Sequence, residues 1–87
     1  MASELNEAYK RAQDAMAELK GLVRTVLEIG PDSGMKNAEV GRTLGIYGGH
    51  IEHEGHISRT LLAMLEAEGV VEQSSVDKKW KLRVHIS

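Results

Sequence analysis

Three histidines recur at every third position of one short stretch, as His50, His53 and His56, and two glutamates alternate with them. Imidazole and carboxylate groups bind zinc, nickel and copper, so the first chemistry that this spacing suggests is a metal site. A structural zinc site holds its metal with four fixed ligands, however, and Gly55 interrupts the run. We therefore expect no metal and no other cofactor. The cluster leaves a metal- or pH-responsive regulator open as an alternative, because histidine changes its charge between about pH 5 and 8.

Cationic side chains gather near the C-terminus. The whole chain has a net charge of −2, but residues 70–87 hold four lysine and arginine residues against two carboxylates. Phosphate groups are the ligands that such a basic segment would bind. The alternative is a strand whose edge is protected from aggregation by lysine. The four cations are Lys78, Lys79, Lys81 and Arg83.

Arg59 is a second cationic candidate, in an otherwise acidic part of the chain. An arginine can bind guanine through two parallel hydrogen bonds, which contributes roughly 1–3 kcal/mol to discrimination between bases. The alternative is an ordinary surface ion pair with Glu66 or Glu39. The sequence alone leaves both interpretations open.

Catalysis has little support. The chain has no cysteine that could act as a nucleophile. Gly45, Gly48 and Gly49 do not follow a predicted strand, so they do not form a dinucleotide-binding loop. No pair of carboxylates marks a cleft. We expect that the protein is not an enzyme.

The elements that position these residues begin with a long helix over residues 1–30. Apolar residues occupy the a and d positions of a heptad repeat from Leu5 to Ile29, and Gly30 and Pro31 end the pattern. Such a helix is longer than a small domain needs to cover its own core. We expect its second half to be the first core helix and its first half to form a homodimer, the alternative being a frayed, alanine-rich end. The expected dimerisation residues are Leu5, Ala8, Tyr9, Ala12, Met16 and Leu19.

Residues 31–87 are expected to complete a single small domain. Asn37 is the expected N-cap of its first helix. Ile57, Leu61, Met64 and Leu65 are expected on the inward face of its second. The chain has no long apolar run, so we expect no membrane span and no signal peptide, and a cytoplasmic location. The predicted elements are helices over about 36–45 and 52–69, strands over about 70–74 and 79–86, and a third short strand near 34–35.

Two segments resemble one known family. The sequence S-R-T-L-L-A-M-L-E-A-E-G-V-V-E, residues 58–72, is similar to the third helix and first wing strand of winged helix-turn-helix proteins. The sequence A-E-V-G-R-T-L-G, residues 38–45, is similar to their second helix. In that family the fifth residue of this helix is small because the third helix crosses over it, and the matching residue is Gly41. Residues 46–56 depart from the family, which has a much shorter turn there.

The resemblance implies a fold that is mainly α with a small β-wing, in the α+β class, as a winged helix-turn-helix with an extended N-terminal helix. It implies a bacterial- or archaeal-type transcriptional regulator that binds double-stranded DNA, with the third helix in the major groove and the basic wing on the backbone. The alternative is a winged helix that serves as a protein-interaction module of a larger complex, which the net negative charge favours. The candidate DNA-binding residues are Lys36, Arg42, His53, His56, Ser58, Arg59, Thr60, Lys78, Lys79 and Lys81.

Overall fold

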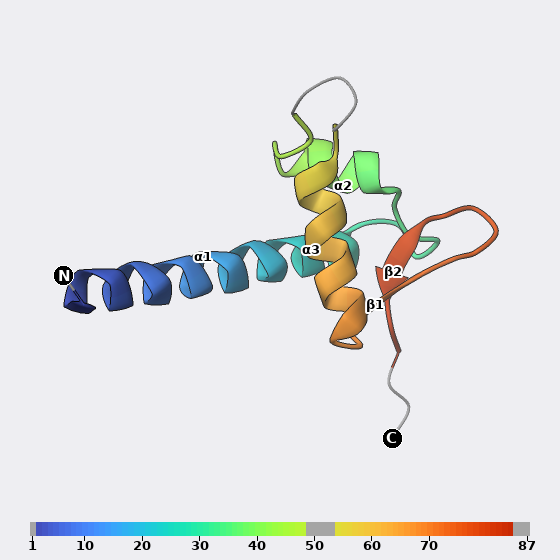
Figure 1. Cartoon of the computed structure of the whole chain (residues 1–87). Helices are drawn as coiled ribbons and strands as arrows, with labels where there is room; N and C mark the ends of the chain where they lie inside the picture. The colour runs from blue at the N-terminus through green and yellow to red at the C-terminus, as the bar shows by residue number, and fades with distance from the viewer. Residues whose placement is uncertain (1, 49–53, 85–87) are drawn as a thin grey trace.

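The computed structural model describes residues 2–48 and 54–84. It is mainly helical with a small antiparallel sheet, as expected (Figure 1). None of the helices in the described part of the chain has the length and apolarity that a membrane span needs. The elements are α1 (Ala2–Ile29), α2 (Asn37–Thr43), α3 (His56–Ala67), β1 (Val71–Gln73) and β2 (Trp80–Leu82).

Helix α1 has 28 residues, which at 1.5 Å per residue makes it about 42 Å long. Its last turn closes where the N–H group of Gly30 donates to the carbonyl oxygen of Val26 at 2.9 Å, and Pro31 follows. Within the described part of the chain, α1 packs on the other elements through its second half, where Val23 and Leu27 are buried. Residues 2–15 are exposed and extend away from the other elements (Figure 1).

The core lies where α1, α2, α3 and the hairpin meet. It is almost wholly aliphatic, and Trp80 from β2 is its one aromatic member. Burying side chains of this size stabilises the fold by about 1.5–3 kcal/mol each. The buried core residues are Val23, Leu27, Val40, Leu61, Leu62, Leu65, Val71 and Trp80.

Helix α2 lies within the predicted range, but its N-cap is Lys36 and not Asn37. The backbone N–H group of Lys36 donates to Oε1 of Glu39 at 2.9 Å, which satisfies one donor at the helix start. Gly45, with a φ of +73°, ends the helix as a left-handed residue, which fits its expected place after the last turn.

Helix α3 begins later than predicted. Glu54 and Gly55 form a turn and the helix starts at His56, so the predicted start near residue 52 is wrong at least over residues 54 and 55. The reason is the backbone of Gly55, which has a φ of +77° and cannot continue a right-handed helix. Residues 49–53 lie outside the described residues. Ile57 is also not on the inward face, because its side chain is 49% exposed.

The two strands pair in the register Val71 with Leu82, Glu72 with Lys81 and Gln73 with Trp80. Each strand has three residues, so the predicted strands over 70–74 and 79–86 are too long in the described part. Residues 85–87 are not described. The alternation of apolar and polar residues over 80–86 predicts an inward-facing Val84, but Val84 is 83% exposed, two residues after β2 ends at Leu82.

The expected third strand is present as a single bridge between Met35 and Trp80. The N–H group of Met35 donates to the carbonyl oxygen of Trp80 at 2.9 Å, and the reverse bond is 2.7 Å. This bridge joins the segment before α2 to the hairpin. It therefore holds the start of α2 beside β2.

Candidate nucleic-acid interface

Helices α2 and α3 approach closely at Gly41. A Cβ atom added at this glycine would lie 2.8 Å from the Ser58 side-chain oxygen and 3.2 Å from Cβ of Tyr47. Real Cβ atoms do not approach other heavy atoms this closely, so only glycine fits without movement of its neighbours. This crossing confirms the expectation for Gly41, and it places the N-terminal half of α3 across α2.

A buried polar cluster fixes the start of α3. Ser58 is fully buried, and its hydroxyl donates to Oδ1 of Asn37 at 2.8 Å. Nδ2 of Asn37 in turn donates to the carbonyl oxygen of Gly55 at 3.1 Å. The cluster thus joins the first residue of α2 to the N-cap of α3. Ser58 was predicted to contact DNA, and this is wrong in the structure, because the side chain faces α2 and has no access to the surface.

The outward face of α3 is formed by His56, Arg59, Thr60 and Ala63, all of which are exposed. Their spacing of three and four residues places them on the same side of the helix. Of the candidates in this region, the structure therefore brings together His56, Arg59 and Thr60. His53 lies outside the described residues.

Arg59 is not held by the carboxylates that were its alternative partners. Over residues 2–48 and 54–84, no ion pair joins it to Glu39 or Glu66. The ion pairs within these residues are Arg11 with Glu7, Lys20 with Glu68 and Arg24 with Glu28. The guanidinium of Arg59 is thus available to an external ligand at the start of α3.

Of the three candidate metal ligands, only His56 lies within the described residues. His50 and His53 lie outside the described residues, and His56 is exposed at the first position of α3. Within the described ranges, no three histidine, cysteine, aspartate or glutamate side chains come together in a way that would hold a metal ion.

The hairpin loop presents two of the basic candidates. Lys78 is exposed and has a φ of +63°, and Lys79 is half-buried. The N–H group of Lys79 donates to Oδ1 of Asp77 at 3.0 Å. This hydrogen bond lowers the pKa of the Asp77 carboxyl below its usual range, so a negative charge stays beside the two lysines.

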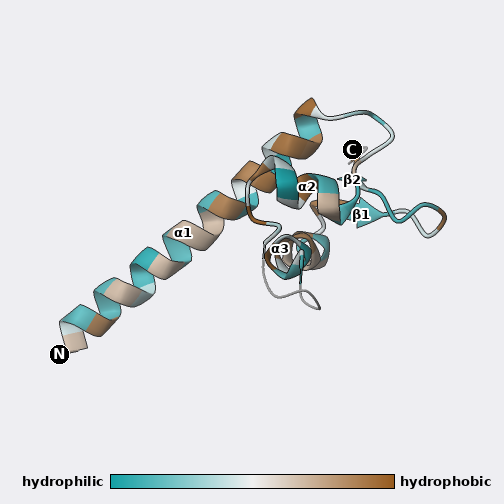
Figure 2. Cartoon of the chain, turned by 90° about the horizontal axis from the view of Figure 1, so that it is seen from above, coloured by the Kyte–Doolittle hydropathy of each residue, from teal (hydrophilic) through white to brown (hydrophobic). Residues whose placement is uncertain are grey.

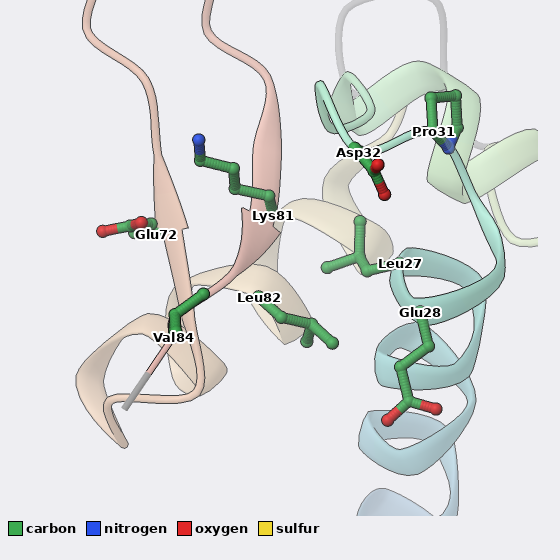
Figure 3. A pocket seen from close by; sticks show the side chains of 8 residues that line it. All are labelled: Leu27, Glu28, Pro31, Asp32, Glu72, Lys81, Leu82 and Val84. Carbon is green, nitrogen blue, oxygen red and sulfur yellow. The ribbon is translucent and has the colours of Figure 1, made fainter. Parts of the chain in front are cut away.

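Lys81 lies in a different environment from the loop lysines. It lines a hollow of about 460 Å³ between the hairpin and the end of α1, together with the carboxylates Glu28, Asp32 and Glu72 (Figure 3). Glu72 is also its partner across the strands. These carboxylates place negative charge around the hollow that Lys81 lines, which makes Lys81 a weaker candidate for phosphate binding than Lys78. No sequence pattern indicates this environment of Lys81, because Glu28 and Asp32 are distant from it along the chain.

Lys36 and Arg42 lie at opposite ends of α2. Lys36 is exposed and directly follows Met35, which pairs with β2. Arg42 stacks its guanidinium over the ring of Tyr47, 4.5 Å from the ring centre. This cation–π contact holds the arginine near the end of α2 but leaves its hydrogen-bond donors available.

Comparison with known proteins adds no family. No protein-family model matches the chain, and neither the curated proteins nor the solved structures yield a significant similarity.

Proposed function

We propose that this protein is a winged helix-turn-helix protein that binds double-stranded DNA as a transcriptional regulator. The observation that carries the proposal is Arg59, an exposed arginine without an ion-pair partner among the described residues, at the start of a helix that the Asn37–Ser58–Gly55 cluster fixes in place. An α-helix fits the major groove of B-DNA, and residues near its N-terminus meet the base edges.

The order of the elements supports the same function. Two short helices in contact, followed by a hairpin with a basic loop, match the arrangement in which the third helix enters the groove and the wing touches the backbone. In this proposal Arg59 contacts a base from the start of α3. Lys36, Arg42, Lys78 and Lys79 contact phosphates, which position the protein without reading sequence.

The alternative is a winged helix that binds another protein. The net charge of −2 favours this alternative, because DNA-binding domains commonly carry a basic surface. The carboxylates around Lys81 also reduce the basic area of the hairpin. The two functions differ in their dependence on salt.

Fluorescence anisotropy of labelled random duplex DNA, at about 50 and 200 mM salt, tests the proposal. A protein that makes six to ten phosphate contacts should lose roughly 10³–10⁵ in affinity across this range. No binding at the lower salt concentration, by protein that is folded by circular dichroism, would overturn DNA binding and leave the protein-interaction module. This assay needs no knowledge of the specific site.

A further inference from the structure

The first half of α1 has an apolar face that no other part of residues 2–48 and 54–84 covers. Residues 2–15 are all exposed, and the side chains of Leu5 and Tyr9 are each 69% exposed. The same face continues at Leu22, which is 43% exposed although it lies beside the core. In Figure 2 this half of α1 stands clear of every other element. Such an apolar stripe on a well-formed helix marks an interaction surface.

A groove of about 210 Å³ lies between the middle of α1 and the start of α3, and its lining is mainly apolar. Ile57, on the α3 side, is half exposed there. Met16 and Val23, seven residues apart, show which side of α1 faces α3, since Met16 lines the groove and Val23 is buried in the core. Tyr9 lies seven residues before Met16, so it is on the same side of the helix. The lining residues are Met16, Leu19, His56, Ile57, Thr60 and Leu61.

We propose that a second copy of this chain covers both surfaces, with the two α1 helices antiparallel and Tyr9 of each copy in the groove of the other. In the register that fits, Leu5 lies opposite Leu22 of the second copy, Ala8 opposite Leu19, and Ala12 opposite Ala15. The exposed first half of α1 in each copy then lies along the second half of α1 in the other copy, which packs on the core. Small residues face leucine or one another, which lets the two helices approach closely.

Charge selects this orientation. In an antiparallel pair, residues at the same flanking heptad position meet across the seam, so Arg11 lies near Glu18 of the second copy and the symmetric pair repeats the contact. In a parallel pair, Arg11 would meet Met16 and Glu18 would meet Val23, and neither charge would have a partner. Among the described residues of the single chain, the partner of Arg11 is Glu7 on the same helix, at 3.2 Å. The antiparallel pair also brings Tyr9 to Met16 on the side that faces α3.

This dimer does not depend on DNA binding, because its seam lies on α1 and on the α1-facing side of α3. It does change the interpretation of two candidate residues. His56 and Thr60 line the groove that Tyr9 of the second copy fills, so they contribute to the dimer, whereas Arg59 stays outside it. Loss of DNA binding with an intact dimer, or of the dimer with intact weak DNA binding, separates the two proposals.

Analytical ultracentrifugation of the full chain at about 1–100 μM, without DNA, is the first test. We expect a dimer whose dissociation constant rises at least about thirtyfold in Tyr9→Ala, because the side chain is lost from two symmetric contacts. Lys10→Ala is the matched control on the outer face and should leave the constant unchanged. A monomer throughout this range overturns the proposal.

A charge exchange tests the register. Arg11→Glu and Glu18→Arg should each weaken the dimer about tenfold, and the double variant should restore it, because the pairs across the seam are then opposite in sign again. Lys10→Glu and Asp14→Arg make the same charge changes on the outer face and serve as controls. Failure of the double variant to restore association would overturn the antiparallel register.

Crosslinking tests the orientation independently, since the chain has no cysteine of its own. An equimolar mixture of Leu5→Cys and Leu22→Cys should form a mixed disulfide on oxidation, because the two positions are opposite each other. Leu5→Cys alone should not crosslink, because its two copies are about 26 Å apart along the seam. Efficient crosslinking of Leu5→Cys alone would indicate a parallel pair and contradict the proposal.

Discussion

The hydroxyl of Ser58 donates to Oδ1 of Asn37 at 2.8 Å, across the contact between α3 and α2. The two residues are 21 positions apart in the chain, and each begins or nearly begins its helix. Ser58 Oγ also lies 3.2 Å from the carbonyl oxygen of Gly55. This cluster sets the position of α3 relative to α2, and so fixes where Arg59 points.

Ser58→Ala should destabilise the fold without exposing new surface. It leaves the half-buried Oδ1 of Asn37 without a donor, which costs about 1–3 kcal/mol. In a domain of this size that is a fall in Tm of about 4–8 °C per kcal/mol, measurable by thermal circular dichroism. Ser75→Ala in the exposed hairpin loop is the control and should change Tm little. An unchanged Tm in Ser58→Ala would contradict the role assigned to the cluster.

Two glycines should respond oppositely to the same substitution. Gly41→Ala places a Cβ atom 2.8 Å from the Ser58 side-chain oxygen, so it should destabilise the protein by about 1–3 kcal/mol. Gly21→Ala adds a Cβ atom with nothing within 4 Å, so it should stabilise α1 by about 0.5–1 kcal/mol. Urea unfolding of both variants measures the difference. Equal effects would contradict the close crossing at Gly41.

The sequence predicted the features that depend on local backbone chemistry. Gly30 with Pro31, Gly45 and Gly69 end their helices where expected, because glycine adopts a positive φ or proline blocks the next turn. The bridge at Met35 was also anticipated. Winged helix as the specific fold remains a proposal.

The predicted inward face of α3 was partly wrong, because a polar side chain, Ser58, faces inward. Periodicity treats serine as exposed, so the inward face of α3 was expected at Ile57, Leu61 and Leu65. The buried face instead includes Ser58 and Leu62, and it is rotated so that Ile57 is half exposed. Ser58 and Leu62 are four residues apart and therefore lie on the same face of α3. This spacing, together with the small residue Gly41 on the facing helix, was the sequence signal for the buried face. The hydrogen bond to Asn37 joins distant residues, which no local pattern can reveal.

Acid should loosen the hairpin loop at one identifiable bond. The N–H group of Lys79 holds the pKa of Asp77 below its usual range. A carboxyl group whose pKa is lower in the folded state stabilises that state above the unfolded pKa, and the contribution is lost as the pH falls through the folded pKa. The Lys79 amide shift, followed by NMR from about pH 6 to 2, should change below about pH 4. Asp77→Asn should abolish this transition, and a transition that persists in the variant would assign it to another group.

Arg59→Gln should lose specific recognition rather than all DNA binding. The DNA is first obtained by selection of tight binders from a random duplex pool with the unaltered protein. If Arg59 contacts a base, the variant should bind the selected duplex about 5–150-fold more weakly, which corresponds to roughly 1–3 kcal/mol. Its affinity for random duplex should fall only a fewfold, because just one of several cationic contacts is removed. Arg24→Gln on α1, where Arg24 pairs with Glu28 at 3.4 Å, removes the same charge from a different helix and is the matched control. If both variants lower the affinity for both duplexes equally, Arg59 acts only through its charge, and the proposal that α3 recognises a base through Arg59 is wrong.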